Sequence, residues 1–320
     1  MSDVAVAVVC ADPHDQPPEL AARLGGDADL TFVYDTDLLR QVLPSSDAVF
    51  VWDFQTTRLR DAWPERTQVR WVHVASAGVH PLLFPELRAQ PVVLTNSSGV
   101  FDAAIAEFVL GAMLLFATDL PTTLRLQREH RWQHRERLRL AGSTVLVVGA
   151  GAIGRATARL ASAAGCRAVG VARTGRDDPD FDRVVPIAAF DAELPNADYI
   201  AVTAPLTSDT AGLLGSAAFA RTRPGAVLIN VGRGPIVDDA ALLAALDAGR
   251  LRGAVLDVFA DEPLPPDHPY WDRPDVVVSP HMCGDYAGFG DVLVDLFLDN
   301  FRRWRVGDEL RNVVDKDRGY

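Results

Sequence analysis

Three polar side chains that could act together on a carbonyl group occur in the last third of the chain. They are an arginine, a glutamate and a histidine, at Arg233, Glu262 and His281. Arg233 could hold an anionic substrate and polarise its carbonyl, and His281 could deliver a proton to the oxygen as hydride arrives at the carbon. Glu262 could orient the imidazole ring and favour its protonated form. These residues therefore predict acid–base catalysis coupled to hydride transfer.

Each of the three residues also has a non-catalytic interpretation. An arginine near a turn is commonly a surface ion-pair partner, a Glu-Pro pair is commonly part of a loop, and a single histidine is commonly structural. Their joint placement favours a catalytic role, because the three residues follow strand candidates at residues 226–230, 254–258 and 276–279. Ligands of open parallel sheets bind at the carboxyl ends of the strands, so we expect the three side chains at one sheet edge.

A glycine-rich turn indicates what else binds at that edge. The apolar run 145–148 leads into Gly149, Gly151 and Gly154, and an alanine-rich helix pattern follows over residues 153–164. Such a turn presents backbone N–H groups and the positive end of a helix dipole to a diphosphate. The first glycine permits the turn, the second lets the backbone approach the pyrophosphate, and the third lets helix and strand pack closely. The alternative is a plain strand-to-helix turn, but the flanking elements favour a dinucleotide site.

The residue at the tip of the next strand distinguishes the two nicotinamide dinucleotides. NAD-type sites place a carboxylate there, about 20 positions after the glycines, to hold the ribose 2′-hydroxyl. Here the strand candidate 167–171 runs into Arg173, Thr174 and Arg176, and no carboxylate occurs before Asp177. These side chains suit a 2′-phosphate through charge-assisted hydrogen bonds, so NADP(H) is favoured over NAD(H). A solvent-exposed arginine loop is the alternative interpretation.

The elements that position these residues fall into two α/β blocks. Short apolar strands alternating with helix-compatible stretches predict parallel sheets. The first block has strand candidates at 4–9, 30–34, 48–52, 71–74 and 92–95, without a glycine motif of this kind. The second has them at 145–148, 167–171, 199–203, 226–230, 254–258 and 276–279, which would complete a dinucleotide-binding sheet. A helix pattern over residues 287–305 follows.

An apolar helix pattern over residues 101–118 and an arginine-rich segment over 121–137 precede the glycine motif. The second segment carries Trp132. It could contact another copy of the chain, or it could be a solvated surface helix, and the pattern does not decide between them.

Composition excludes several classes of protein. A length of 320 residues predicts two domains, and a net charge of −12 argues against nucleic acid or an anionic membrane as partner. The only lysine is Lys316, which excludes a P-loop or Schiff-base lysine in a pocket. The three cysteines lack metal-site spacing, no apolar run nears the roughly 20 residues of a spanning helix, and Met1–Asp3 does not begin a signal peptide. We therefore expect a cytoplasmic protein without a metal.

A set of motifs runs through the second block in order. They are Gly149–Gly154, Ala204–Thr207, Asn230–Gly234, Gly253–Phe259 with Glu262-Pro263, and Ser279–His281, and Ala75–Val79 and Asn312–Asp315 extend the pattern towards both ends. On these motifs the chain resembles the D-isomer-specific 2-hydroxyacid dehydrogenase family over essentially its whole length. Arg173 stands where the commonest family pattern has an aspartate, which resembles the NADPH-using glyoxylate/hydroxypyruvate reductase branch.

The resemblance implies an α/β fold of two doubly wound parallel-sheet domains. A Rossmann nucleotide domain, residues 97–284, would be inserted in a flavodoxin-like substrate domain made of residues 1–96 and 285–320. The active site would lie in the cleft, and family members are commonly homodimers through the nucleotide domain. We expect no further regulatory domain after Tyr320.

The resemblance also implies roles for individual residues. Arg233, Glu262 and His281 would be the catalytic set, and the loop of Ser76, Ala77 and Gly78 would bind the substrate carboxylate together with Arg233. The implied cofactor contacts are Gly149, Gly151, Ala152, Ile153, Gly154, Arg173, Thr174, Arg176, Ala204, Pro205, Thr210, Val231, Gly232, Arg233, Asp257 and His281.

The function expected from these observations is reduction of a small 2-oxo acid, such as glyoxylate or hydroxypyruvate, to a D-2-hydroxy acid. NAD(P)H would donate the hydride, and His281 would be the acid/base. The phosphoglycerate, formate and phosphite branches of the family remain alternatives. A dinucleotide-sensing corepressor or scaffold is a further alternative, which the intact Arg233, Glu262 and His281 set disfavours.

Overall fold

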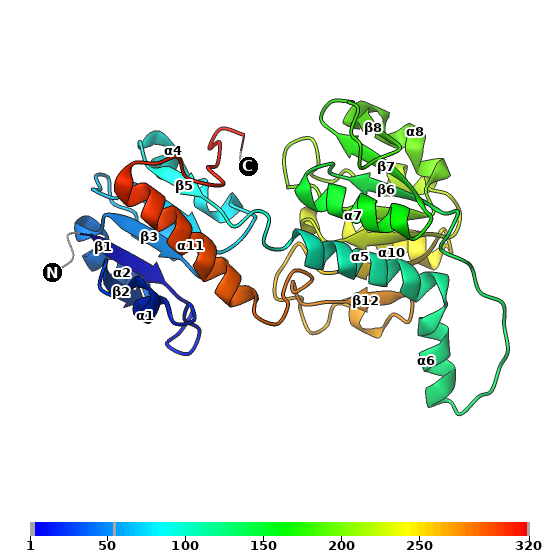
Figure 1. The fold of residues 1–320 in the computed structure, drawn as a ribbon. Coiled ribbons are helices and arrows are strands. Elements are labelled where there is room, and N and C mark those ends of the chain that lie inside the picture. Colours follow the sequence, from blue (N-terminus) through cyan, green and yellow to red (C-terminus); the bar gives the residue numbers. More distant parts are fainter. Residues whose placement is uncertain (1–3, 54–55, 319–320) are drawn as a thin grey trace. The chain divides into compact units, whose positions relative to one another are not determined.

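The structure of the protein is a computed structural model that describes residues 4–53 and 56–318 (Figure 1). Met1–Asp3, interpreted above from sequence, lie outside the described residues. The chain divides into two compact units, one formed by Met1–Phe101 with Tyr286–Tyr320 and the other by Asp102–Asp285. Both units are built on parallel sheets, which confirms the predicted α/β class.

The first unit has a five-stranded sheet in the order β2-β1-β3-β4-β5, the order of flavodoxin-like folds. Its strands are β1 Ala5–Val9, β2 Asp29–Val33, β3 Ala48–Val51, β4 Trp71–Val74 and β5 Val93–Thr95. Its helices are α1 Leu20–Leu24, α2 Thr36–Val42, α3 Arg58–Ala62, α4 Pro85–Ala89 and α11 Phe289–Val306. Helix α11 packs on the sheet through Phe297, whose ring stacks on Phe50 and Trp71 at centroid distances of 4.2 and 5.2 Å.

The second unit has a seven-stranded sheet in the order β12-β11-β10-β9-β6-β7-β8, the Rossmann order with one further strand. Its strands are β6 Thr144–Val148, β7 Arg167–Ala172, β8 Arg183–Pro186, β9 Tyr199–Val202, β10 Ala226–Asn230, β11 Leu251–Leu256 and β12 Val276–Val278. Its helices are α5 Asp102–Ala117, α6 Leu120–Arg128, α7 Ala152–Ala163, α8 Phe190–Glu193, α9 Ser216–Arg221 and α10 Asp239–Asp247. Short 3-10 turns occur at Leu43–Ser45, His80–Leu82, Ile187–Ala189, Leu194–Asn196, Gly234–Ile236 and Pro269–Asp272.

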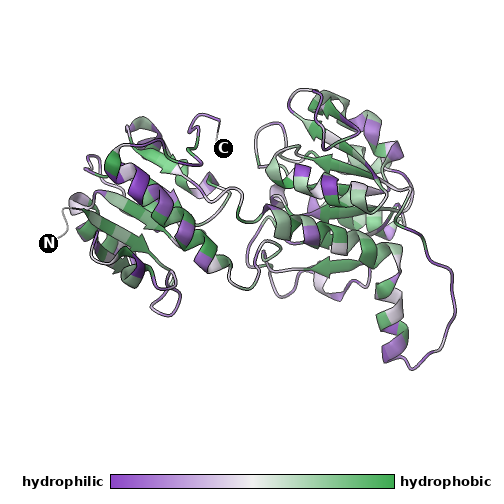
Figure 2. Ribbon diagram, in the orientation of Figure 1, coloured by the Kyte–Doolittle hydropathy of each residue, from purple (hydrophilic) through white to green (hydrophobic). Residues whose placement is uncertain are grey.

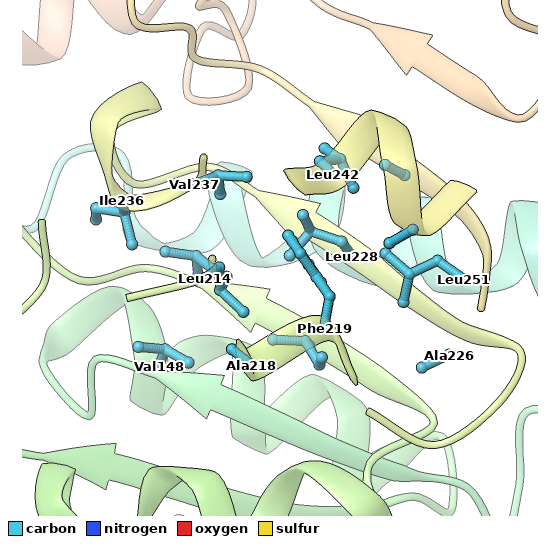
Figure 3. Close-up of a cluster of buried hydrophobic side chains, with 14 of the residues drawn as sticks. Val148, Leu214, Ala218, Phe219, Ala226, Leu228, Ile236, Val237, Leu242 and Leu251 are labelled. Atoms are coloured by element: carbon cyan, nitrogen blue, oxygen red, sulfur yellow. The ribbon is translucent and has the colours of Figure 1, made fainter. Parts of the chain in front are cut away.

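The sheet of the second unit is fixed by burial on both faces. Helices α5 and α7 lie side by side over one face (Figure 1). On the other face Phe219 of α9 and Leu242 of α10 pack with Leu228 of β10 in a cluster of buried apolar side chains (Figure 3). The strands are accordingly hydrophobic almost throughout, and hydrophilic residues gather on outer helix surfaces and loops (Figure 2).

Two sequence-based expectations about local structure were wrong. Strand β8 was not predicted, because Arg183–Pro186 has only one fully buried residue and polar or proline residues at its ends. The segment 121–137 is helical only as far as Arg128, since His130 adopts a left-handed conformation with φ 52°. Beyond it Arg135 turns back to Asp119, its Nε lying 2.5 Å from the carboxylate, while Trp132 is fully exposed.

No single helix in the described part of the chain is long and apolar enough to cross a membrane, and the bent pair α5–α6 meets that requirement only when both helices are taken together. Within residues 4–53 and 56–318, no group of three His, Cys, Asp or Glu side chains is arranged to hold a metal ion. Cys10, Cys166 and Cys283 are buried free thiols.

Candidate active site

The carboxyl edge of the seven-stranded sheet brings Glu262 and His281 together. Glu262 follows β11 and His281 follows β12, and these strands are parallel neighbours. His281 Nδ1 lies 2.7 Å from Glu262 Oε2, and Glu262 Oε1 accepts a hydrogen bond of 2.9 Å from the Phe259 N–H. Both carboxylate oxygens are therefore engaged, which holds the imidazole ring in one orientation.

The charge of Glu262 determines which imidazole nitrogen can exchange a proton. Burial alone would raise the pKa of Glu262, but the hydrogen bonds from His281 and Phe259 and the charges of His281 and Arg233 outweigh it and lower that pKa. An ionised carboxylate can only accept, so Nδ1 of His281 is the donor in this contact. Nε2 is then the imidazole nitrogen that does not face Glu262.

Arg233 follows β10, the third neighbouring strand, and lies within electrostatic range of Glu262. Its Nη1 donates to Gly232 O at 2.6 Å. Burial lowers the pKa of the partly buried guanidinium, and the Glu262 charge opposes that shift. A desolvated cation of this kind gains most from an anionic ligand, as a substrate carboxylate would be.

The loop that carries His281 is organised by Asp257, at the end of β11. His281 has a left-handed φ of 54°, and its N–H donates to Asp257 O at 2.9 Å. The fully buried Asp257 carboxylate accepts from Ser279 Oγ at 2.5 Å, Met282 N at 3.0 Å and Cys283 N at 3.1 Å. Asp257, predicted as a cofactor contact, thus holds the His281 loop in place. A single carboxylate inside the otherwise apolar strand candidate 254–258 was the sequence signal for this second role.

The glycine turn between β6 and α7 has the shape that a pyrophosphate needs. A Cβ on Gly149 would lie 2.6 Å from Ala204 N, and one on Gly154 would lie 1.9 Å from Gly149 O, so neither position accepts a side chain. Gly151 differs, because a Cβ there would meet no atom within 4 Å. Helix α7 starts at Ala152, and its N-cap Gly151 has no side chain to cap the first-turn N–H groups, which a diphosphate could therefore bind beside Ala152 and Ile153. The residues present therefore fit a dinucleotide.

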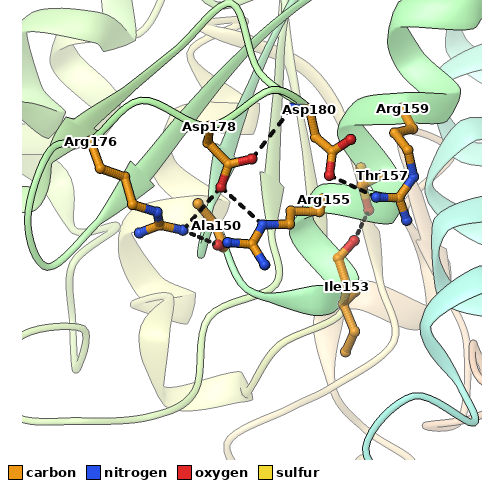
Figure 4. A network of polar contacts seen from close by, with 8 residues as sticks. All are labelled: Ala150, Ile153, Arg155, Thr157, Arg159, Arg176, Asp178 and Asp180. Carbon is orange, nitrogen blue, oxygen red and sulfur yellow. Dashed lines mark hydrogen bonds and ion pairs between the residues drawn. The ribbon is translucent and has the colours of Figure 1, made fainter.

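The three residues predicted for the 2′-phosphate follow β7 and are exposed. Arg173 and Thr174 come directly after the strand. Arg176 reaches back to the glycine turn, where its Nη2 lies 2.5 Å from Ala150 O and 3.3 Å from Asp178 Oδ2 (Figure 4). Arg176 is thus occupied by protein groups, a contact that the sequence did not indicate.

The other predicted cofactor residues also lie in loops at this edge. Thr210 Oγ1 donates to Pro205 O at 2.8 Å and closes the loop after β9. A Cβ on Gly232, beside Val231, would lie 2.7 Å from Ala204 O, so the loops after β9 and β10 are in close contact. The structure therefore collects the predicted cofactor residues on loops after β6, β7, β9, β10, β11 and β12.

The predicted substrate loop belongs to the first unit and follows β4. Ser76 Oγ donates to Gly78 O at 2.6 Å, Asn96 Nδ2 donates to Ala77 O at 2.7 Å, and Ser97 N donates to Ser76 O at 2.9 Å. Sequence reasoning missed Asn96 and Ser97. Two polar residues directly after the last strand of this sheet were the signal that could have identified them.

Comparisons with known proteins agree with this architecture. Residues 110–283 match the family model described as D-isomer specific 2-hydroxyacid dehydrogenase, NAD binding domain. D-3-phosphoglycerate dehydrogenase of Mycobacterium tuberculosis is 32% identical over 274 residues, covering 84% of this chain and 52% of the relative. The chain therefore spans about half the length of such curated relatives. Glyoxylate reductase of Korarchaeum cryptofilum is 28% identical over 256 residues, covering 78% of this chain and 77% of the relative.

Among solved structures, similarity extends over both units. The NADPH-dependent glyoxylate/hydroxypyruvate reductase of Sinorhizobium meliloti, in complex with NADP and sulfate, has a TM-score of 0.86 and 29% identity. The match covers 99% of this chain and 100% of that one.

Proposed function

The chain belongs to the D-isomer specific 2-hydroxyacid dehydrogenase family, and from this premise we propose that it reduces a small 2-oxo acid to a D-2-hydroxy acid. The proposed substrates are of the glyoxylate or hydroxypyruvate type, and the proposed hydride donor is NADPH. The observation that carries the proposal is the 2.7 Å contact between His281 and Glu262, on the same sheet edge as the glycine turn.

In this reaction the bound nicotinamide supplies the hydride to the substrate carbon. The residues of the chain bind the acid and move the proton. Arg233 binds the substrate carboxylate and polarises the carbonyl, and Nε2 of His281 gives its proton to the carbonyl oxygen. Glu262 holds Nδ1 throughout and stabilises the imidazolium before transfer. The ring that remains is neutral and regains a proton from solvent before the next turnover.

We further propose that unit Asp102–Asp285 is the nucleotide domain and that the other unit is the substrate domain. In the latter, the N–H groups of Ala77 and Gly78 would bind the carboxylate. The hydrogen bonds of Asn96 and Ser97 to this loop support that role, because they hold its carbonyls and so fix the orientation of its peptides.

The proposed preference for NADPH is supported by the residues that directly follow β7. Arg173 and Thr174 stand where a carboxylate would otherwise bind the ribose 2′-hydroxyl, and an arginine suits a 2′-phosphate. The Sinorhizobium meliloti reductase, described as NADPH-dependent, supports the same choice.

A homodimer is proposed through the nucleotide domain, with the segment 121–137 as its contact. Trp132 on this segment and Leu138 directly after it have relative exposures of 101% and 58%, and burying these two side chains against a second copy would be favourable. The buried free thiols suit the reducing cytoplasm, where we propose that the enzyme acts.

The decisive experiment follows loss of the reduced-nicotinamide absorbance with NADPH and with NADH. Each is combined with glyoxylate, hydroxypyruvate, pyruvate, 3-phosphohydroxypyruvate and a bulky 2-oxo acid. We expect the highest kcat/KM with NADPH and a two- or three-carbon acid. Preference for 3-phosphohydroxypyruvate would favour the phosphoglycerate branch. Cofactor binding without oxidation by any of these acids would contradict a reductase and favour a dinucleotide sensor.

A further inference from the structure

Arg176 is held by protein groups through both its side chain and its backbone. Its Nη2 donates to Ala150 O at 2.5 Å and lies 3.3 Å from Asp178 Oδ2 (Figure 4). Its N–H donates to Val184 O at 3.2 Å, which joins it to β8. Both the guanidinium and the backbone N–H of Arg176 are therefore held by groups of the fold.

Asp178 is the residue that fixes Arg176 from the other side. Its side chain is 2% exposed, and the same Oδ2 accepts from Arg155 Nε at 2.9 Å, while Oδ1 accepts from Asp180 N at 3.3 Å. Burial would raise the pKa of Asp178, but the hydrogen bonds from Arg155 and Asp180 and the charges of Arg155 and Arg176 outweigh it and lower that pKa. Asp178 is therefore ionised, and it connects the first turn of α7 with the loop after β7.

The contact with Ala150 acts on the peptide unit in the middle of the glycine turn. Ala150 O and Gly151 N–H belong to one planar trans peptide, so they point in opposite directions. Holding the carbonyl towards Arg176 therefore directs the Gly151 N–H away from it. Gly151 is also the position where an added Cβ would meet only open space. The guanidinium thus sets the orientation of a donor in the cradle that would face a pyrophosphate.

We infer that Arg176 is a positioning residue for the glycine turn, acting through Ala150, and that recognition of the 2′-phosphate belongs to Arg173 and Thr174. Asp178 holds Arg176 and Arg155 in their places. This inference rests on the proposed dinucleotide function and revises the expectation that Arg176 and Arg173 share the 2′-phosphate. Of the two arginines in this loop, Arg176 would orient the glycine turn and Arg173 would bind the 2′-phosphate.

The test measures binding of two unreactive ligands by titration calorimetry, ADP-ribose and 2′-phospho-ADP-ribose. Both contain the pyrophosphate, and only the second has the 2′-phosphate. Arg176→Gln is expected to raise the Kd of both by the same factor, about tenfold, whereas Arg173→Gln raises only that of the phosphorylated ligand, by about tenfold or more. The matched control is Arg159→Gln on helix α7, which removes the 2.7 Å pair with Asp180 and is expected to leave both affinities unchanged.

Arg176→Lys separates positioning from charge. Lysine keeps the positive charge, but it is shorter and lacks the rigid guanidinium that directs Nη2 at both Ala150 O and Asp178 Oδ2, so positioning predicts the same joint loss as in Arg176→Gln. Circular dichroism and thermal unfolding establish that each variant is folded before it is titrated. If one Arg176 variant does not fold, the other carries the comparison.

Three outcomes would contradict the inference. Selective loss of the phosphorylated ligand in Arg176→Gln would make Arg176 a phosphate ligand. Retained affinity in both Arg176 variants would remove its positioning role. Wild-type protein that binds neither ligand would contradict the dinucleotide site itself, and with it both the proposed function and this inference.

Discussion

Nδ1 of His281 lies 2.7 Å from Oε2 of Glu262, and the other oxygen of that carboxylate accepts from the Phe259 N–H. The two residues are 19 positions apart in the chain and meet because β11 and β12 are parallel neighbours. The contact assigns the Nδ1 proton, and in the proposed reaction Nε2 is the nitrogen that serves the substrate.

Replacement of His281 by alanine should remove the proton donor while leaving the nucleotide cradle intact. We expect kcat to fall by about 10²–10⁴-fold, the usual contribution of a general acid, with little change in NADPH affinity. Steady-state kinetics combined with fluorescence titration of NADPH measures both quantities. Unchanged turnover in His281→Ala would refute the acid/base role.

Replacement of Arg233 should affect substrate binding as well as turnover. Its guanidinium is partly buried, and burial lowers its pKa, so an anionic substrate is the partner that compensates its desolvation. Arg233→Ala should raise KM for the 2-oxo acid and lower kcat. Arg233→Lys, which keeps the charge but loses the bidentate geometry, should recover part of the binding. If wild type and Arg233→Ala had the same KM, the substrate carboxylate would not be bound by Arg233.

The lowered pKa of Glu262 predicts a pH-dependent contribution to stability. Because the folded-state pKa lies below the usual 4.5, ionised Glu262 stabilises the fold above that pH and loses this effect as the pH falls through its lowered pKa. The difference in unfolding free energy between wild type and Glu262→Gln should therefore be larger near neutral pH than at about pH 3. Urea titrations across this range measure it. A difference that does not vary with pH would contradict the contacts assigned to the ionised Glu262 carboxylate.

Asp257 should matter for the placement of His281 even without touching a substrate. Asp257→Asn places an amide group beside the N–H donors of Met282 and Cys283, so we expect a loss of about 1–3 kcal/mol in unfolding free energy and a fall in kcat. Ser279→Ala removes only one of the donors and should cost less. Denaturant unfolding and kinetics compare the two variants. Wild-type kcat and stability in Asp257→Asn would show that the loop does not depend on this carboxylate.

Two glycine substitutions should separate binding from folding. An alanine at Gly151 meets no atom within 4 Å, so the unfolding free energy should change by no more than about 0.5 kcal/mol, while its methyl group blocks ADP-ribose. An alanine at Gly154 would meet Gly149 O at 1.9 Å and should destabilise the fold by about 1–3 kcal/mol. Calorimetry and thermal unfolding test both. If folded Gly151→Ala still bound ADP-ribose tightly, the pyrophosphate would not bind at this turn.

Much of the fold was predictable because its signals are local. Continuous apolar runs such as 145–148 and 199–203 report burial on both faces, and their alternation with helix patterns predicts parallel sheets. Strand β8 escaped prediction because Arg183–Pro186 lies at the sheet edge, where one buried residue gives too weak a pattern. The end of α6 at Arg128 depends on the left-handed His130 and on Arg135 folding back to Asp119, which no periodicity encodes.

The sequence by itself determined the two parallel sheets and the glycine turn. It also placed Arg233, Glu262 and His281 after strands of one sheet, because parallel strands bring their carboxyl ends to one edge. Only the tertiary structure decided the partners of these residues. Arg176 contacts Ala150, which lies 26 positions earlier in the chain, and Asp257 contacts Cys283, which lies 26 positions later. Such contacts depend on the direction of each side chain after the strands have paired, and residue spacing along the chain does not carry that information.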